Sequence, residues 1–203
     1  MGPQSKNDGG RGGAEDGEGW KVHGWVRWLE GLRGMYERRM NRMCQILEDG
    51  RFHLKQQTPM KQEDSDWAVV SKVKLYEFGW PRAGMFVWIK IAFETHPLWG
   101  QVEGPKMARA LWIFLTTKPY LVLASPGQIF SPTPEIAEAE GWKYFRLCFA
   151  AVSEEEVDAS SARFVKGIQA FWRIKSKKDL EDIETMVSED KEGLVDLGMN
   201  WTC

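Results

Sequence analysis

The chain has 203 residues, of which 43% are apolar and 12% aromatic, which is enough for one sizeable domain or two small ones. Its net charge of −2 and pI near 6.0 give no sign of affinity for nucleic acid or membrane surfaces. The sequence contains neither the roughly 20 consecutive apolar residues of a membrane span nor a secretory signal, so we expect a cytoplasmic protein. The three cysteines, Cys44, Cys148 and Cys203, do not have the spacing of metal ligands, and we expect them to be reduced thiols.

Residues 1–19 are rich in Gly, Asp and Glu and have no periodicity, so they are predicted to be disordered. The run Gly-Gly-Arg-Gly-Gly at 9–13 resembles one unit of an RNA-binding Gly-Arg tract. Because it occurs once, beside acidic residues, a linker is the preferred interpretation and no nucleic-acid partner is expected.

Residues 20–50 are predicted to form a long linking helix that ends at Gly50. A helix of this length measures about 40 Å and could bridge two domains. Three glycines weaken it, each by about 1 kcal/mol relative to Ala, so we expect the helix to lean on another surface. Three arginines are interpreted as a solvated face. The apolar positions are Val22, Trp25, Leu29, Leu32, Tyr36, Met40, Met43 and Leu47, the glycines Gly24, Gly31 and Gly34, and the arginines Arg38, Arg39 and Arg42.

The next part of the chain predicts two strands. Residues 51–71 are polar and irregular and are interpreted as a surface excursion. A strand over 73–78 follows, then a turn with Pro81 and Gly84. Residues 85–91 are apolar at nearly every position, which indicates a central strand covered on both faces.

Residues 92–104 are predicted to be a loop, and helical spacing returns from Pro105 to Leu115. The apolar run 120–124 predicts another strand, and 125–132 a loop containing Pro126 and Gly127. Residues 132–143 form a second polar excursion.

The strand that follows, from 144 to 150, places one arginine among apolar residues. Side chains alternate across a strand, so Phe145, Leu147 and Phe149 share one face that must be core, while Arg146 shares the other with Tyr144, Cys148 and Ala150. An arginine in such a run cannot be left unpaired in the interior. It is therefore a partner in a structural salt bridge, an edge-strand residue that reaches water, or a planar clamp for a carboxylate.

Ser153 and Glu156 form a capping box at the start of a helix that is predicted to reach Ile174. The tail 175–203 is charged, with a short helix expected over 180–187. The order helix–strand–strand–helix–strand–strand–helix predicts an α+β fold, with a small sheet of about four strands and helices packed on it.

Motifs for metal, nucleophilic or phosphate chemistry are missing from the sequence. His23, His53 and His96 lie on separate segments and are interpreted as surface residues rather than ligands or bases. Arg146 is therefore the one candidate site residue that the sequence itself singles out.

Three blocks resemble the C-terminal, small domain of class I/II aminotransferases, which are pyridoxal-phosphate-dependent enzymes of fold type I. They are Pro81-x-x-Gly84-Met85-Phe86-x-Trp88, then Pro126-Gly127-x-x-Phe130, then Tyr144-Phe145-Arg146-Leu147-x-Phe149. The helix around Trp28–Arg39 is similar to the one that joins the two domains of these enzymes. The loop Phe93–Leu98 is most similar to the eukaryotic aromatic and α-aminoadipate branch.

The resemblance implies that residues 51–174 are the small domain and that Arg146 binds the α-carboxylate of the substrate. It implies that Gly84, Pro126, Gly127 and Phe130 line the substrate entrance. The complete enzyme would use pyridoxal 5'-phosphate to transfer an amino group between an aromatic amino acid and a 2-oxo acid, with the large cofactor domain or a homodimer partner beside this one.

One departure from the family is large, because the lysine motif that forms the Schiff base is absent from this sequence. Without that lysine the chain has no catalytic or cofactor-binding residue of its own, and we expect it to be inactive alone. The alternative is a non-catalytic interaction module or split subunit that reuses the small-domain fold and binds a partner through the residue 22–49 helix.

Overall fold

The computed structural model describes residues 22–56 and 70–189, so the predictions for 1–19, for the end of the tail and for Cys203 lie outside the described residues. The chain divides into two units, Met1–Gly34 and Met35–Cys203. The first helix, α1 (Val22–Gly50), contributes to both, which confirms the long predicted helix. In the first unit most of its apolar side chains are exposed, and the rings of Trp25 and Trp28 contact each other edge to face, with 5.5 Å between their centroids.

The second unit contains two antiparallel sheets. A hairpin pairs β1 (Phe52–Gln56) with β2 (Val70–Lys74). A four-stranded sheet has the order β3-β4-β6-β5. Its strands are β3 (Tyr76–Phe78), β4 (Phe86–Ile91), β5 (Ser125–Pro126) and β6 (Tyr144–Cys148).

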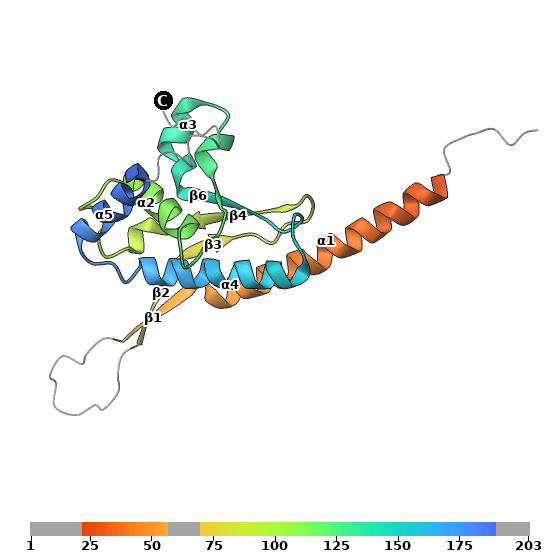
Figure 1. The fold of residues 1–203 in the computed structure, drawn as a ribbon, viewed down its shortest axis with the longest axis horizontal. Coiled ribbons are helices and arrows are strands. Elements are labelled where there is room, and N and C mark those ends of the chain that lie inside the picture. Colours follow the sequence, from red (N-terminus) through yellow and green to blue (C-terminus); the bar gives the residue numbers. More distant parts are fainter. Residues whose placement is uncertain (1–21, 57–69, 190–203) are drawn as a thin grey trace, which may run out of the picture. The chain divides into compact units, whose positions relative to one another are not determined.

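The helices of this unit lie both between and after the strands of the four-stranded sheet, and this mixture of helices with antiparallel strands confirms the predicted α+β class. Figure 1 shows α4 running along one side of the four-stranded sheet. None of the helices in the described part of the chain is both long and apolar enough to cross a membrane. The helices are α2 (Gly104–Thr116), α3 (Pro134–Ala139), α4 (Glu154–Phe171) and α5 (Lys177–Glu189), with 3-10 turns η1 (Phe93–Thr95), η2 (Gly127–Phe130) and η3 (Gly141–Lys143).

One face of the four-stranded sheet, here called the inner face, builds the core. As the alternation predicts, Phe145 and Leu147 of β6 and Phe149 directly after it are buried, beside Val87, Ile89 and Ile91 of β4. Phe149 contacts Tyr36 of α1, and Tyr76 of β3 contacts Phe164 of α4 at 5.8 Å between ring centroids. The opposite, outer face carries Phe86, Trp88, Lys90, Tyr144 and Arg146.

A buried hydrogen bond ties the end of α1 to this sheet. The hydroxyl of Tyr76 donates to the carbonyl oxygen of Leu47 at 2.7 Å. Leu47 lies in the last turn of α1, where carbonyls have no partner within the helix. Burial raises the pKa of the Tyr76 phenol, so this donor keeps its proton.

The arginines of α1 in the second unit are not merely solvated. Arg38 contacts Glu154, and Arg42 contacts Asp158 through both of its carboxylate oxygens and lowers the pKa of that carboxyl. Arg39 donates to the carbonyl oxygen of Ala150 at 2.7 Å. The exposed pairs contribute little stability individually, but they connect α1 to the start of α4.

Three segments differ from the sequence predictions. Residues 51–71 contain strand residues of both β1 and β2 rather than a purely irregular excursion. The run 120–124 is not a strand, because the amide of Val122 donates to Leu115 instead of a neighbouring strand, and sheet pairing begins only at Ser125. The polar segment 132–143 contains α3 and η3.

The helix predicted after β6 is confirmed at its start. The hydroxyl of Ser153 accepts a hydrogen bond from the amide of Glu156 at 3.3 Å, as a capping residue does. The second hydrogen bond of a capping box, from the Ser153 amide to the Glu156 side chain, is replaced by an ion pair between Glu156 and Arg163. The helix ends at Phe171 rather than Ile174, and the next helix is longer than the 180–187 segment expected.

The interpretation of His96 as a surface residue is wrong. Its side chain is only 3% exposed and packs against Phe171 and Trp172. Its Nδ1 accepts from the amide of Leu98, which assigns the proton to Nε2, the donor to the carbonyl oxygen of Phe171 at 3.1 Å. Burial lowers the pKa of the imidazole, and the hydrogen bond to Phe171 offsets part of that effect.

This burial predicts a loss of stability in mild acid. Because the folded pKa lies below the unfolded value of about 6.5, the unfolded chain binds the proton first as the pH falls. The free energy of unfolding should therefore fall below pH ~6.5, by at most about 1.4 kcal/mol per pH unit from this residue. Urea unfolding at several pH values between ~5 and ~8 measures it. His96→Gln should reduce the dependence of the free energy of unfolding on pH, and His53→Gln should leave that dependence unchanged. Equal dependence on pH in both variants would contradict the role given to His96.

Candidate functional site

The guanidinium of Arg146 lies between two aromatic rings on the outer face of the sheet. Its Cζ is 3.7 Å from the centroid of the Phe130 ring and 4.0 Å from that of Phe86. Phe86 belongs to β4 and Phe130 to the end of η2. Aromatic faces attract a cation and restrict its plane, so the two rings fix the direction in which the guanidinium points.

Strand register explains this arrangement. Arg146 is paired with Trp88 of β4 on one side and Ser125 of β5 on the other. Trp88 contacts Phe130 edge to face at 5.6 Å, so the ring that covers Arg146 is itself held in place. A frame of three aromatic side chains from two segments therefore surrounds one arginine.

Within the described residues, the guanidinium of Arg146 forms no ion pair and no hydrogen bond. This finding disfavours the structural salt bridge. The edge-strand explanation also fails, because β6 lies between β4 and β5. A half-buried guanidinium with its donors unused is chemically suited to a bidentate contact with a carboxylate.

The loop after β5 brings three of the predicted site residues next to β6. Pro126 pairs with Phe145. A Cβ at Gly127 would lie 2.6 Å from the carbonyl oxygen of Gly141 and 2.7 Å from the Cβ of Tyr144, so only glycine permits this close approach. The loop thereby delivers Phe130 to Arg146. That these residues line a substrate entrance stays a prediction.

Gly84 lies in the turn between β3 and β4, where its φ of 83° suits glycine. None of the described contacts joins it to Arg146. Gly84 is linked to the site only by its position in the sequence, because Phe86, two residues later, is the first residue of β4.

Phe86 and Trp88 complete the frame, yet reasoning from the sequence assigned them no site role. The expectation that residues 85–91 are covered on both faces is wrong for the described part of the chain, since Trp88 is 42% exposed. The strand alternation already puts Phe86 and Trp88 opposite the core positions Val87 and Ile89. That alternation, combined with pairing to β6, is the signal that could have identified them.

The histidine, cysteine and acidic side chains of the described residues do not meet the needs of a metal site. Among the residues that the structure describes, no group of three or more His, Cys, Asp or Glu side chains could hold a metal ion. Cys44 is buried, which raises the pKa of its thiol to about 11 and keeps it protonated at neutral pH. Cys148 is a free thiol on β6.

No protein-family model and no curated protein matches the chain. Solved structures do resemble its fold. A structure of aminotransferase Aro9 from C. albicans with ligands shares 23% identity over 75% of this chain, with a TM-score of 0.50. A second, of the aromatic aminotransferase Aro9 from C. albicans, shares 24% over 75%, with a TM-score of 0.48. The α-aminoadipate aminotransferase LysN from Thermus thermophilus, complexed with N-(5'-phosphopyridoxyl)-L-leucine, shares 20% over 74%, with a TM-score of 0.45.

The match covers only 27% of the chain in both Aro9 structures and 28% in LysN. This chain therefore spans little more than a quarter of the length of those enzymes. At this level of identity the likeness concerns the fold alone. The chain has the fold of a partial aminotransferase domain.

Proposed function

We propose that this chain is the carboxylate-binding part of a pyridoxal-phosphate-dependent aminotransferase that moves an amino group between an aromatic amino acid and a 2-oxo acid. The observation that carries the proposal is the guanidinium of Arg146, held between Phe86 and Phe130 without an acidic partner among the described residues. The shared fold with part of an aminotransferase supports it. We also propose that the protein acts in the cytoplasm.

In this role Arg146 grips the α-carboxylate of the substrate with two parallel N–H···O bonds. A two-point contact fixes both the position and the rotation of the carboxylate, which holds the bond at Cα in one direction. Phe86 and Phe130 keep the guanidinium plane in place before the substrate arrives, so less conformational freedom is lost on binding. Gly84, Pro126 and Gly127 act through the backbone shape of the two loops that position these rings.

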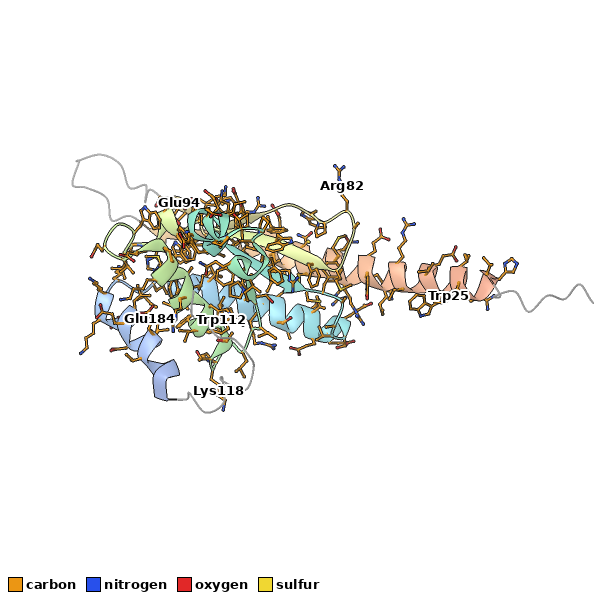
Figure 2. All side chains as sticks on the ribbon, turned by 90° about the horizontal axis from the view of Figure 1, so that it is seen from above. Trp25, Arg82, Glu94, Trp112, Lys118 and Glu184 are labelled. Atoms are coloured by element: carbon orange, nitrogen blue, oxygen red, sulfur yellow. The ribbon has the colours of Figure 1, made fainter. Side chains whose placement is uncertain are left out.

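Neither Lys118 nor Lys143 fits covalent attachment of the cofactor, whose chemistry requires a lysine amine at the reaction centre. Lys143 contacts Glu140 at 2.9 Å and lies over the ring of Trp142. Lys118 protrudes just after α2, on the opposite side of the unit from Arg82 of the β3–β4 turn (Figure 2). We therefore derive no step through the cofactor, and we propose that its lysine comes from a large domain or homodimer partner.

An absorption and turnover experiment tests whether the Schiff-base lysine comes from outside this chain. The purified chain is mixed with pyridoxal phosphate, phenylalanine and a 2-oxo acid. We expect neither the visible band of an internal aldimine nor formation of the new amino acid. Sodium borohydride treatment followed by mass spectrometry checks for a reduced adduct on any lysine. A stoichiometric adduct on one lysine together with turnover would contradict the proposal that the lysine comes from elsewhere.

The exposed apolar side chains of α1 favour the alternative, a non-catalytic interaction module. Val22, Val26, Trp28 and Leu29 are all exposed in the first unit, and an apolar helix face of this kind commonly binds a groove on a partner. Size-exclusion chromatography with light scattering tests it, with Trp28→Glu and Leu29→Glu as disrupting changes. Self-association or binding of an added large domain that these changes abolish would support the module; a monomer indifferent to them would count against it.

A further inference from the structure

A concave surface lies on the outer face of the sheet, on the β3 side of Trp88. Its volume is about 460 Å³, within the usual range of small-molecule sites. The lining comes from segments that are far apart in the sequence: the residue before β1, the end of β2, strand β3 with the residue after it, and strands β4 and β6. The residues are Arg51, Lys74, Glu77, Phe78, Gly79, Trp88, Lys90 and Tyr144.

The lining contains three cations and one carboxylate. Glu77 contacts Lys74, which lowers the pKa of the carboxyl, and the charges of Lys90 and Arg51 lower it further. Lys90 is the cross-strand partner of Glu77 but forms no ion pair within the described part of the chain. Even after Arg51 is balanced by Glu48 outside the lining, at 2.9 Å, a positive charge remains.

Arg51 contributes a partly exposed guanidinium to this lining. The side chain is held over the ring of Phe78, with 5.6 Å between Cζ and the ring centroid.

Aromatic residues form part of the remaining lining. Trp88 and Tyr144 lie on the outer face of the sheet, and the amine of Lys90 lies 5.8 Å from the centroid of the Tyr144 ring. Aromatic walls favour a flat ring stacked or set edge to face, and the cations favour an anionic substituent on it.

We propose that this concavity binds a small aryl anion, a carboxylate or phosphate attached to an aromatic ring, at a site separate from Arg146. Arg146 does not belong to the lining of the concavity, and Trp88, which lines it and pairs with Arg146 on β6, lies next to both sites. The inference does not depend on the proposed aminotransferase role, since none of the cations in the lining belongs to the carboxylate clamp.

Titration of the isotope-labelled chain followed by NMR tests the site, with benzoate and phenyl phosphate as probes. Benzyl alcohol supplies the ring without the charge, and inorganic phosphate the charge without the ring. We expect saturable shifts at the backbone amides of Glu77 and Lys90 and at the indole N–H of Trp88 with both aryl anions, and weaker effects with the other two compounds. The stronger of the two aryl anions identifies the headgroup.

Lys90→Gln should weaken the aryl anion about three- to tenfold, as removal of one partly exposed charge-assisted contact does, and added salt should weaken binding in the wild type. Lys178→Gln, an exposed lysine on α5, is the matched control and should have no effect. Arg146→Gln should also leave this affinity unchanged, which separates the site from the proposed clamp. Absence of shifts at these positions, equal binding of benzyl alcohol, or equal effects of Lys90→Gln and Lys178→Gln in folded variants would overturn the proposal.

Discussion

Replacing Arg146 with glutamine should weaken binding of phenylpyruvate, an aromatic 2-oxo acid, by about 10- to 100-fold. The magnitude corresponds to the net loss of one charge-assisted hydrogen bond, about 1.5–3 kcal/mol, because the amide of glutamine can still donate one neutral hydrogen bond. Glutamine still packs between Phe86 and Phe130, so the aromatic frame persists while the charge is removed. Isothermal titration calorimetry on the wild type and variant measures the change.

Two further variants make this result specific. Arg146→Lys keeps the charge but not the planar fork, so we expect an affinity between those of the wild type and the glutamine variant. Arg109→Gln removes an exposed arginine from α2 and should not change the affinity. If Arg146→Gln bound phenylpyruvate as tightly as the wild type while remaining folded, the carboxylate clamp would be refuted.

Phe145→Ala should have the largest effect on stability, lowering the free energy of unfolding by about 3–5 kcal/mol. Phe145 is 1% exposed on the inner face of β6, so its removal leaves a cavity as well as lost apolar burial. Urea unfolding followed by circular dichroism measures the change as a shift in the midpoint urea concentration, provided that the m-value is the same in both proteins.

The control for this core substitution is Leu123→Ala, since Leu123 is 77% exposed and should change the free energy of unfolding by no more than about 0.5 kcal/mol. If Phe145→Ala cost less than about 1 kcal/mol, β6 would not place its Phe145 face in the core. The opposite placement of Arg146 would then lose its basis too.

The parts of the fold that could be predicted are those governed by local periodicity. Helical spacing indicated α1, α2 and α4, and two-residue alternation on β6 separated the core residues from Arg146. Ser153 marked the start of α4 because a cap acts through neighbouring amides. In each case the feature depends on residues that are close together in the sequence.

The parts that could not be predicted depend on distant partners. Residues 120–124 have the composition of a strand, but the Val122 amide is taken by Leu115. His96 looked like a surface residue because nothing nearby in the sequence shows that α4 ends beside it and offers the carbonyl oxygen of Phe171. Tertiary packing overrides local preference at such positions.

The candidate site was half predictable for the same reason. Its arginine was visible in the sequence as a charge inside an apolar strand, with three explanations open. The choice among them required strand order, which places β6 away from the edge, and the acidic neighbours, which the described residues do not provide. The aromatic frame of Phe86, Trp88 and Phe130 required the β4–β6 register and the loop at Gly127.

The most direct measurement follows the side-chain N–H signals of Arg146 by NMR during titration with phenylpyruvate and, separately, with its methyl ester. We predict that the acid shifts the Arg146 Nε–H signal in a saturable way and slows rotation of the guanidinium, as two parallel bonds to a carboxylate require. The ester, whose carboxyl group is uncharged, should produce little change. An unmoved Arg146 signal at saturating acid, or the same response to the ester, would contradict the assignment of Arg146 as the carboxylate clamp.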